Sequence, residues 1–332
     1  MRDPLFYLCA AALGATLSAW LAWLFTPRIR ELALRCGAAP APRARDVHRE
    51  PIPRWGGLAI YAAFCLSLGV GSLVVQYGFG RPITEATLWP GIGLVLAGGV
   101  LTLMGAVDDR YELSAGKQIV VQLLCALIVI PFGVKISFIT HPLTGEMVSL
   151  GWVGYPLTVL WLIAVANAVN WIDGIDGLAA GVSAIAAFTM ALMAAWSRQP
   201  GLTILAAALG GSLLGFLRFN FNPAKIFMGG GAPFVGFTLA CISTVGAFKA
   251  PVAVAIFAPL LILALPIFDT ANVIVQRWRA GRPIYQADKS HLHHRLLERG
   301  FTQKQTVLIL YGISICLCVV AFGAFVVFSR AG

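Results

Sequence analysis

Ten long apolar runs alternate with shorter polar connections along the 332-residue chain. The runs cover residues 4–26, 57–78, 88–107, 119–134, 155–170, 178–196, 201–217, 232–248, 251–275 and 306–328. A helix needs about 20 apolar residues to cross the hydrocarbon core of a bilayer, and most of the runs come close to that length. The pattern predicts an all-α polytopic membrane protein of about ten transmembrane helices that form a single domain over residues 1–332.

One connection is predicted to form β-strands. Residues 135–155 are too polar to cross a membrane, and short apolar stretches flank a His-Pro-Leu-Thr-Gly-Glu turn. Two such stretches around a turn predict a small β-hairpin. His141 at its tip is expected to be a solvated turn residue.

Composition supports the membrane assignment and excludes other classes. Hydrophobic residues make up 59% of the chain and charged residues 11%, whereas soluble domains carry about 25% charged residues. A soluble enzyme, a disordered protein and a nucleic-acid-binding protein are therefore excluded in their ordinary forms. The net charge of +10 instead suggests anionic lipid and phosphorylated substrates. The seven cysteines show no metal-ligand or disulfide spacing.

The basic residues fall mainly on one side of the predicted membrane. Of the 24 Lys and Arg residues, 18 lie in alternate connections at 27–54, 108–118, 171–177, 218–231 and 276–305. By the positive-inside rule these five connections are cytoplasmic, so both termini and the β-hairpin lie outside. The same connections contain or adjoin 11 of the 14 acidic residues. The site of any chemistry is therefore expected in these five cytoplasmic loops.

Two groups of polar residues lie at the ends of apolar runs. Asp108 and Asp109 come after the third run, where two adjacent carboxylates suit either a divalent metal or a proton acceptor. An interfacial stop paired with Arg110 and Lys117 is the alternative. Amides and carboxylates then recur every third residue at the end of the fifth run: Asn167, Asn170, Asp173 and Asp176. Three-residue spacing keeps neighbours on one helical face, and capping alone does not explain four such residues.

Segment 218–233 combines basic, aromatic and glycine residues. Arg218 and Lys225 can meet phosphate, and Phe227 can stack on a base. Three successive glycines permit close backbone approach to a ligand. A glycine-rich re-entrant turn is the alternative explanation.

Residues 287–300 predict a short amphipathic helix with Ser290 as N-cap and Gly300 as its stop. His291 and His294 would share a face, with Arg295 nearby, and could grip a pyrophosphate. Zinc binding is less well supported, because no Cys or fourth ligand stands at a suitable spacing. Thr302 and Gln305 then form a capping-box pattern at the start of the last run.

These motifs closely resemble the polyprenyl-phosphate N-acetylhexosamine-1-phosphate transferase family (glycosyltransferase family 4) across nearly the whole chain. The matching segments are RDVHREPIPRWGGL at 45–58, DDRYELS at 108–114, NAVNWIDGIDG at 167–177, FNFNPAKIFM at 219–228 and DKSHLHHR at 288–295. The His-x-His-His ending looks like the branch that uses UDP-N-acetylglucosamine. The resemblance implies transfer of sugar-1-phosphate from a UDP-sugar to undecaprenyl phosphate, with release of UMP and with Mg²⁺ or Mn²⁺. It further implies a bacterial inner-membrane enzyme that starts a cell-envelope glycan, and it leaves a homodimer open.

The resemblance also implies roles for individual residues. Asp108, Asp109 and Asp173 would lie near the metal and the lipid phosphate, with Asp108 as general base and Lys117 holding the lipid phosphate. The remaining residues would line the nucleotide-sugar site: Asn167, Asn170, Asp173 and Asp176 around the donor, Phe227 at uracil, and His291, His293, His294 and Arg295 at the diphosphate or sugar.

One position departs from the family pattern. The family usually reads Phe-Met-Gly-Asp-x-Gly-Ser and uses that Asp as a metal ligand, whereas this chain has Gly230 there. Either the remaining carboxylates and water suffice for the metal, or the site is impaired. The alternative to an active transferase is therefore a non-catalytic relative that still binds UDP-sugar or lipid phosphate. A transporter fits less well, because its polar groups would lie at mid-helix.

Overall fold

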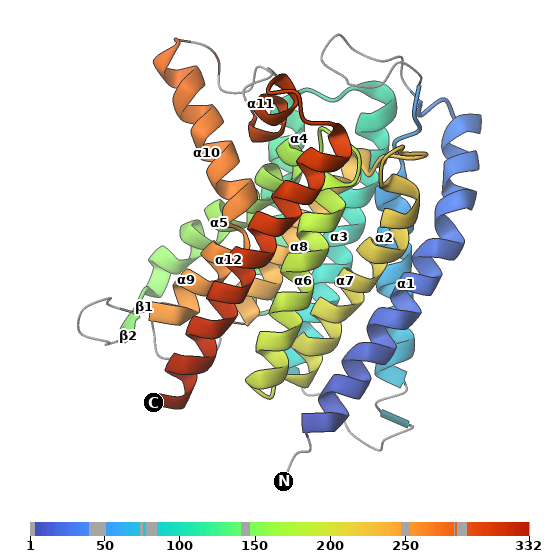
Figure 1. Cartoon of the computed structure of the whole chain (residues 1–332). Coiled ribbons are helices and arrows are strands. Elements are labelled where there is room, and N and C mark those ends of the chain that lie inside the picture. Colours follow the sequence, from blue (N-terminus) through green and yellow to red (C-terminus); the bar gives the residue numbers. More distant parts are fainter. Residues whose placement is uncertain are drawn as a thin grey trace.

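The computed structural model describes residues 4–39, 51–73, 76–77, 85–140, 147–246, 253–281, 283 and 291–331, and it is almost entirely helical. The long elements are α1 (Pro4–Arg35), α2 (Gly56–Leu73), α3 (Glu85–Tyr111), α4 (Ala115–Val129), α5 (Gly154–Ile172), α6 (Leu178–Trp196), α7 (Pro200–Asn220), α8 (Ala232–Val245), α9 (Ala253–Ile262), α10 (Ala264–Arg279), α11 (Leu292–Glu298) and α12 (Gln303–Ala331). They form an elongated bundle in which α1 begins and α12 ends at the same end (Figure 1).

Helices lie within every one of the ten predicted apolar runs. Six of them, in the described part of the chain, are long and apolar enough to cross a membrane: Gly56–Leu73, Leu88–Tyr111, Gly151–Ile172, Leu178–Trp196, Pro200–Asn220 and Gln303–Val327. Shorter apolar helices include Ala115–Val129 and Gly229–Val245. The helical membrane-protein class is confirmed at the level of six candidate spans, and the count of ten stays a prediction.

Three predicted boundaries were wrong. The first helix continues through Pro27 to Arg35, so the predicted loop 27–54 begins as helix. Helix α3 continues to Tyr111, which places Asp108 and Asp109 inside its last turn rather than after it. The run 251–275 is two helices that break at Leu263. Pro266 explains this break, because it has no N–H to donate to the carbonyl four residues earlier.

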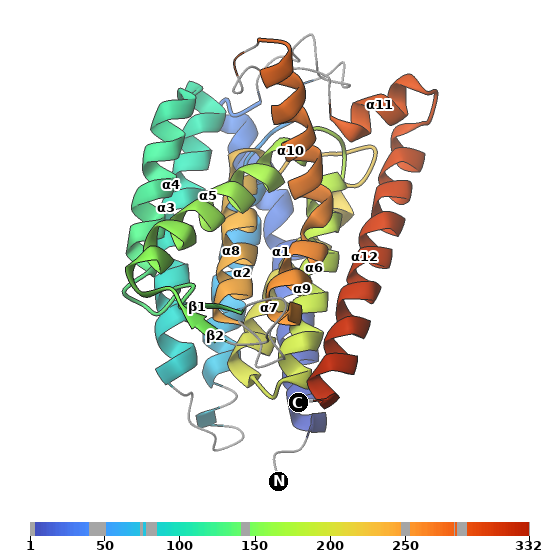
Figure 2. The same ribbon diagram turned by 90° about the vertical axis from the view of Figure 1, so that its left-hand side faces the viewer.

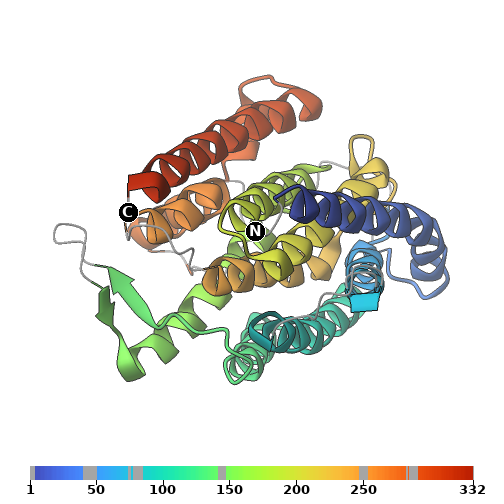
Figure 3. The ribbon, with the colours of Figure 1, turned by 90° about the horizontal axis from the view of Figure 1, so that it is seen from below.

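The centre of the bundle is made by α6, α7 and α8. Every residue of α8 from Ala232 to Thr244 is buried, and a helix that is apolar on all sides belongs in a core. Helix α12 instead lies along one edge, beside α9 and α6 (Figures 2 and 3). The outward faces of the peripheral helices carry large exposed hydrophobic side chains, as expected for a surface that meets lipid.

Helices α1 and α7 approach each other closely because of small residues. A Cβ atom on Gly211 or Gly215 of α7 would overlap the backbone of Ala15 or Ala19 of α1. Ser18 also donates a 2.7 Å hydrogen bond to the Ala208 carbonyl across this contact. Glycines four residues apart are the usual means by which membrane helices pack backbone to backbone.

The predicted hairpin strands are confirmed. Strand β1 (Phe138–Thr140) pairs antiparallel with β2 (Met147–Ser149), with Ile139 opposite Val148. The tip, including His141, lies outside the described residues. The hairpin adjoins the start of α5, where Thr158 accepts a 2.9 Å hydrogen bond from the Ile136 N–H.

Candidate active site

Asp108 and Asp109 lie in the last turn of α3, and their side chains are in different environments. Asp108 is half-buried, and its Oδ1 accepts hydrogen bonds from the Leu113 N–H at 2.7 Å and from Gln118 Nε2 at 3.0 Å. Asp109 is buried at 9% exposure. The two donors fix the orientation of Asp108, because a carboxylate held at one oxygen keeps one rotamer.

The Asp109 carboxylate sits on the glycine segment that precedes α8. Both of its oxygens lie 3.0 Å from the Gly230 N–H, which donates to them. This contact requires glycines: a Cβ on Gly230 would overlap the backbone of Gly105 in α3, and one on Gly231 would overlap Gly57 in α2. Position 230 therefore has no room for a side chain, and an aspartate there would displace α3.

Asp173 and Asp176 do not continue the face of α5. The helix ends at Ile172, and Asp173 is its C-cap with φ −76° and ψ 49°, so the expectation of four polar residues on one helical face was wrong. Asp176 is buried, and its Oδ2 accepts from Asn222 Nδ2 at 2.8 Å and from the Ala224 N–H at 2.9 Å. The carboxylate thus anchors the loop after α7 to the loop after α5.

The carboxylates of the site are buried or half-buried and lie close enough to influence one another. The pKa of Asp173 is raised to about 7, mainly by burial; the neighbouring Asp176 contributes to the rise, whereas the Gly229 N–H and the Arg54 guanidinium oppose it. The Asp109 carboxylate interacts electrostatically with the carboxylates of Asp108 and Asp173 and with the guanidinium of Arg54. Three predicted site residues from two connections are therefore within electrostatic reach of one another.

The donor chemistry of this cluster suits a divalent cation. Mg²⁺ is commonly bound through one or two carboxylates together with substrate phosphates and water, and Asp109 and Asp173 supply two carboxylates beside one backbone segment. Within the described part of the chain, no group of three or more acidic, His or Cys side chains could hold a metal by itself. The residues present fit a metal that binds together with a phosphorylated ligand.

Three further predicted ligand residues lie on α4 and α5. Asn167 is engaged with α4: its Nδ2 donates to Gln122 Oε1 at 2.6 Å and to the Ile163 carbonyl at 2.8 Å. Asn170 is half-buried one turn later on α5, and its carbonyl accepts from the Asp173 N–H at 3.3 Å. Lys117 is exposed in the first turn of α4.

The segment with Phe227 is paired to the entry of α2. The Phe227 N–H donates to the Pro53 carbonyl at 2.8 Å, and its carbonyl accepts from the Gly56 N–H at 2.9 Å. Arg218 and Lys225, which the sequence predicts to meet phosphate, line a cavity against α1. Phe227 is not among the residues that line this cavity.

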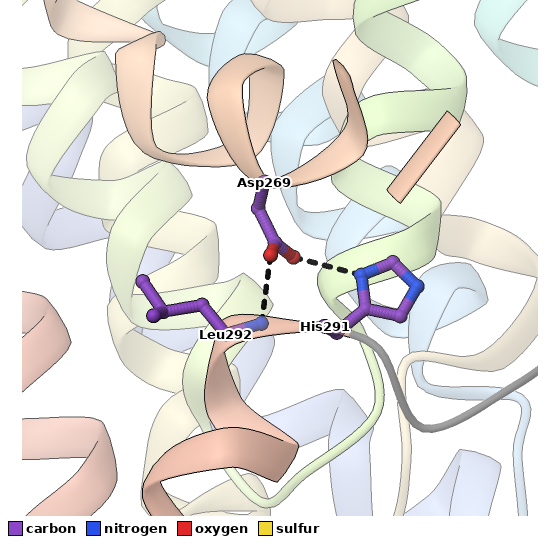
Figure 4. Close-up of polar contacts among 3 residues, drawn as sticks. All are labelled: Asp269, His291 and Leu292. Atoms are coloured by element: carbon purple, nitrogen blue, oxygen red, sulfur yellow. Dashed lines mark hydrogen bonds and ion pairs between the residues drawn. The ribbon is translucent and has the colours of Figure 1, made fainter. Parts of the chain in front are cut away.

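His291 is held by a carboxylate from another helix. Its Nδ1 lies 2.8 Å from Oδ2 of Asp269 in α10, and Oδ1 of the same carboxylate accepts from the Leu292 N–H at 2.7 Å (Figure 4). Asp269 therefore fixes both the ring of His291 and the first N–H of α11. An imidazole held at Nδ1 presents Nε2 to a ligand.

The rings of the three histidines lie next to one another. His293 lies between His291, at 5.5 Å between ring centroids, and His294, at 4.4 Å. His293 is 2% exposed, and its Nε2 has no hydrogen-bond partner in the described structure. Burial, with the two neighbouring imidazoles, lowers its pKa to about 3. His293 is thus neutral at neutral pH. Arg295, on the same helix, is exposed.

The ends of α11 agree in part with expectation. The helix begins at Leu292 with His291 as N-cap, so Ser290, which lies outside the described residues, is not that cap. Gly300 has φ +91°, and the N–H groups of Gly300 and Phe301 donate to the carbonyls of Leu297 and Leu296. This is the glycine-terminated helix end that was predicted.

The capping box at the start of α12 is confirmed. The Thr302 N–H donates to Gln305 Oε1 at 2.9 Å, and the Gln305 N–H donates to Thr302 Oγ1 at 3.3 Å. The two bonds satisfy one donor each at the end of the helix.

Sequence reasoning gave no role to several residues that shape the site. Asp269 lies in a run that was read as membrane-spanning, and a lone carboxylate in such a run signals function. Arg54 lies within a matched segment, yet nothing in its local pattern indicates that it faces Asp109 and Asp173. Gln118 and Gln122 lie one turn apart on α4, and only the packing of α4 against α3 and α5 shows their partners.

Comparison with known proteins agrees with the geometry. The profile described as glycosyl transferase family 4 matches residues 91–247. A probable undecaprenyl-phosphate N-acetylglucosaminyl 1-phosphate transferase of Bacillus subtilis is 38% identical over 87% of this chain and 77% of its own length. The decaprenyl-phosphate N-acetylglucosaminephosphotransferase of Mycolicibacterium smegmatis is 36% identical over 95% and 81%. The undecaprenyl-phosphate alpha-N-acetylglucosaminyl 1-phosphate transferase of Escherichia coli is 28% identical over 86% and 76%. With such similarity over most of its length, the chain belongs to glycosyl transferase family 4.

Proposed function

We propose that the protein transfers N-acetylglucosamine-1-phosphate from UDP-N-acetylglucosamine to a polyprenyl phosphate, with undecaprenyl phosphate as the natural acceptor, and releases UMP. The observation that carries this proposal is the convergence of Asp108, Asp109 and Asp173 at one end of an apolar bundle. The names of the relatives, all polyprenyl-phosphate transferases of this sugar phosphate, support the donor and the acceptor.

The reaction is a displacement at phosphorus. An oxygen of the lipid phosphate attacks the β-phosphorus of the UDP-sugar, and a new P–O bond forms. The bond from that phosphorus to the oxygen shared with the α-phosphate breaks, and its electron pair leaves with UMP. Such a transfer depends mainly on positioning and on neutralising charge, which are the contributions that this site can make.

Asp108 is the proposed general base. The second ionisation of a phosphate monoester has a pKa of about 6, so a fraction of the acceptor still carries a proton at neutral pH. Asp108 accepts that proton while Leu113 and Gln118 hold its Oδ1 in place. Asp109 and Asp173 would hold Mg²⁺ or Mn²⁺, which when bound neutralises charge on the diphosphate.

The other site residues bind and orient the donor. His291 and His293, with His294 and Arg295, meet the diphosphate or the sugar, and Phe227 faces the uracil. Asp176 keeps the loop after α7 in place through Asn222 and Ala224. Asn167 and Asn170 line the donor site from α5, and Lys117 receives the lipid phosphate.

The proposed topology places this end of the bundle in the cytoplasm of a bacterium, at its inner membrane. Ten crossings, both termini outside and five cytoplasmic loops near 27–54, 108–118, 171–177, 218–231 and 276–305 follow from the distribution of basic residues. Labelling of single cysteines by an impermeant reagent tests this. A cysteine at Lys304 should be protected in intact cells, and one at Arg198 should react.

A second candidate function rests on Gly230. The family's usual carboxylate is missing there, and Gly105 leaves no room for one. A protein with this segment could bind UDP-sugar or lipid phosphate without turnover. The two functions differ in UMP release and agree in ligand binding.

The test uses purified protein with undecaprenyl phosphate and Mg²⁺, and measures UMP release with a panel of donors. We expect release with UDP-N-acetylglucosamine, little with UDP-N-acetylmuramoyl-pentapeptide, and none with a chelator. Asp108→Asn should lower turnover by about 10²–10⁴-fold, while UDP-N-acetylglucosamine still binds. Binding by the wild-type protein without any UMP release would favour the second candidate.

A further inference from the structure

A cavity of about 440 Å³ lies between α1, the end of α7 and the loop that follows α7. It does not include the carboxylates or the histidines of the proposed active site. Its lining consists of four apolar side chains and three cations: Trp23, Leu24, Pro27 and Phe219, with Arg28, Arg218 and Lys225.

The cavity lies next to the close contact between α1 and α7. On α7, Gly211 and Gly215 are followed four residues later by Phe219; on α1, Ala15 and Ala19 are followed by Trp23. Residues four apart lie on one helical face. Beyond the small residues of this contact, both helices thus carry a large aromatic side chain, and Trp23 and Phe219 both line the cavity.

The three cations are available to a ligand. Arg28, Arg218 and Lys225 are all exposed, and in the described structure none of their side chains pairs with a carboxylate. Among the described residues, the one hydrogen bond from these three side chains runs from Arg28 Nη1 to the Leu24 carbonyl at 2.9 Å. Glu31 follows one turn later on α1, and in the described part of the chain no ion pair joins it to the three cations. Three basic side chains around one cavity favour an anion.

The apolar part of the lining points to a lipid as the source of that anion. Helix α1 presents exposed Leu13, Trp20 and Trp23 along its outer face, and tryptophans near the end of an apolar face mark the membrane interface. An acyl chain can lie against this face while its phosphate reaches the cations. Clusters of basic residues at a membrane surface attract anionic lipid.

The cavity is separated from the proposed reaction by the loop after α7. The Ala224 N–H holds Asp176 on one side of this loop, whereas the next side chain, Lys225, lines the cavity. Arg30 Nε donates to the Lys225 carbonyl at 3.1 Å and ties α1 to the same loop. A ligand in the cavity would therefore contact the back of a segment that supports the site.

We infer that this cavity binds the phosphate of an anionic glycerophospholipid of the surrounding bilayer. The acyl chains lie along α1 past Trp23, and the phosphate lies among Arg28, Arg218 and Lys225. The inference does not depend on the transferase reaction.

Native mass spectrometry of the purified full chain tests the inference. Protein in detergent is mixed with phosphatidylglycerol or with phosphatidylcholine, and retained lipid is counted. The test variant is Arg218→Gln with Lys225→Gln. The matched control is Arg299→Gln with Lys304→Gln, which removes the same charge from exposed positions away from the cavity. Thermal unfolding midpoints confirm that both variants are folded.

We expect the wild type and the control to retain phosphatidylglycerol in preference to phosphatidylcholine. The cavity variant should bind phosphatidylglycerol about 25-fold more weakly, since each of the two basic residues contributes about fivefold at an anionic surface. Equal retention of the two lipids by the wild type, or equal loss in both variants, would overturn the inference. Displacement of phosphatidylglycerol by inorganic phosphate alone would also overturn it, because the occupant would then be free phosphate. Displacement by undecaprenyl phosphate in the wild type but not in the cavity variant would overturn it as well, because the occupant would then be the acceptor lipid.

Discussion

Helix α3 lies close to the glycine segment before α8. Because of this contact, we expect glycine-to-alanine substitutions at two positions of α3 to change the stability of the protein in opposite directions. A Cβ on Gly105 would overlap the carbonyl of Gly230, whereas one on Gly91 would meet no atom within 4 Å. Gly91→Ala replaces a poor helix former by the best one and should stabilise the protein by about 0.5–1 kcal/mol. Gly105→Ala gains the same propensity but must push α3 away from backbone atoms, and overpacking of this kind costs about 1–3 kcal/mol.

The consequence at the site follows from the same geometry. The Gly230 N–H donates to both oxygens of Asp109, so a shift of α3 by even a fraction of an ångström lengthens these bonds. Gly105→Ala should therefore lower both the thermal unfolding midpoint and UMP release, whereas Gly91→Ala should raise the midpoint and leave activity unchanged. Thermal unfolding in detergent and a UMP assay measure the two effects. Equal midpoints for the two variants would refute the reasoning.

Three further predictions concern the histidines and the start of α12. The His293 imidazole has a pKa of about 6.5 in the unfolded chain and of about 3 in the folded protein. The free energy of unfolding therefore decreases as the pH falls below 6.5, because only the unfolded chain binds the proton. The wild type should lose about 2 kcal/mol more than His293→Gln between pH 7.5 and 5, and parallel pH curves of the unfolding free energy would contradict this. Asp269→Asn keeps an oxygen for the Leu292 N–H but turns the other atom into a donor, which reverses the tautomer of His291. Turnover should fall by about 10–100-fold with little change in the unfolding midpoint, and normal turnover would show that the tautomer does not matter. Gln305→Ala breaks the capping box with Thr302 and should cost about 1 kcal/mol without a change in turnover; an unchanged unfolding midpoint would contradict this.

The local signals in the sequence predicted the elements of the fold well. Apolar runs located the helices, because a bilayer-spanning segment must satisfy its backbone internally and carry apolar side chains along its length. The hairpin strands, the glycine stop after α11 and the capping box at Thr302 were also predicted, since each depends on residues fewer than about ten positions apart. The carboxylates on two connections were correctly placed at one end of the bundle.

The parts that could not be predicted depend on packing between distant segments. Three-residue spacing suggested that Asp173 continues a helical face, but the helix ends first, and Asp173 instead interacts with the Gly229 N–H and Arg54. Asp269 in α10 pairs with His291 at the start of α11, and the two residues are 22 positions apart in the sequence. At Gly230, sequence comparison raised the question of a missing carboxylate, and only the structure shows that the backbone of Gly105 occupies the space.

The most direct test of the account is UMP release by purified wild-type protein and by Asp173→Asn, measured with undecaprenyl phosphate, UDP-N-acetylglucosamine and Mg²⁺. Asn is isosteric with Asp, and Glu298→Gln removes an exposed carboxylate from α11 as a control. The account predicts metal-dependent release by the wild type and the control, and a loss of about 100-fold or more in Asp173→Asn. No release by the wild type, or full release by Asp173→Asn, would contradict the claim that these carboxylates carry out the transfer.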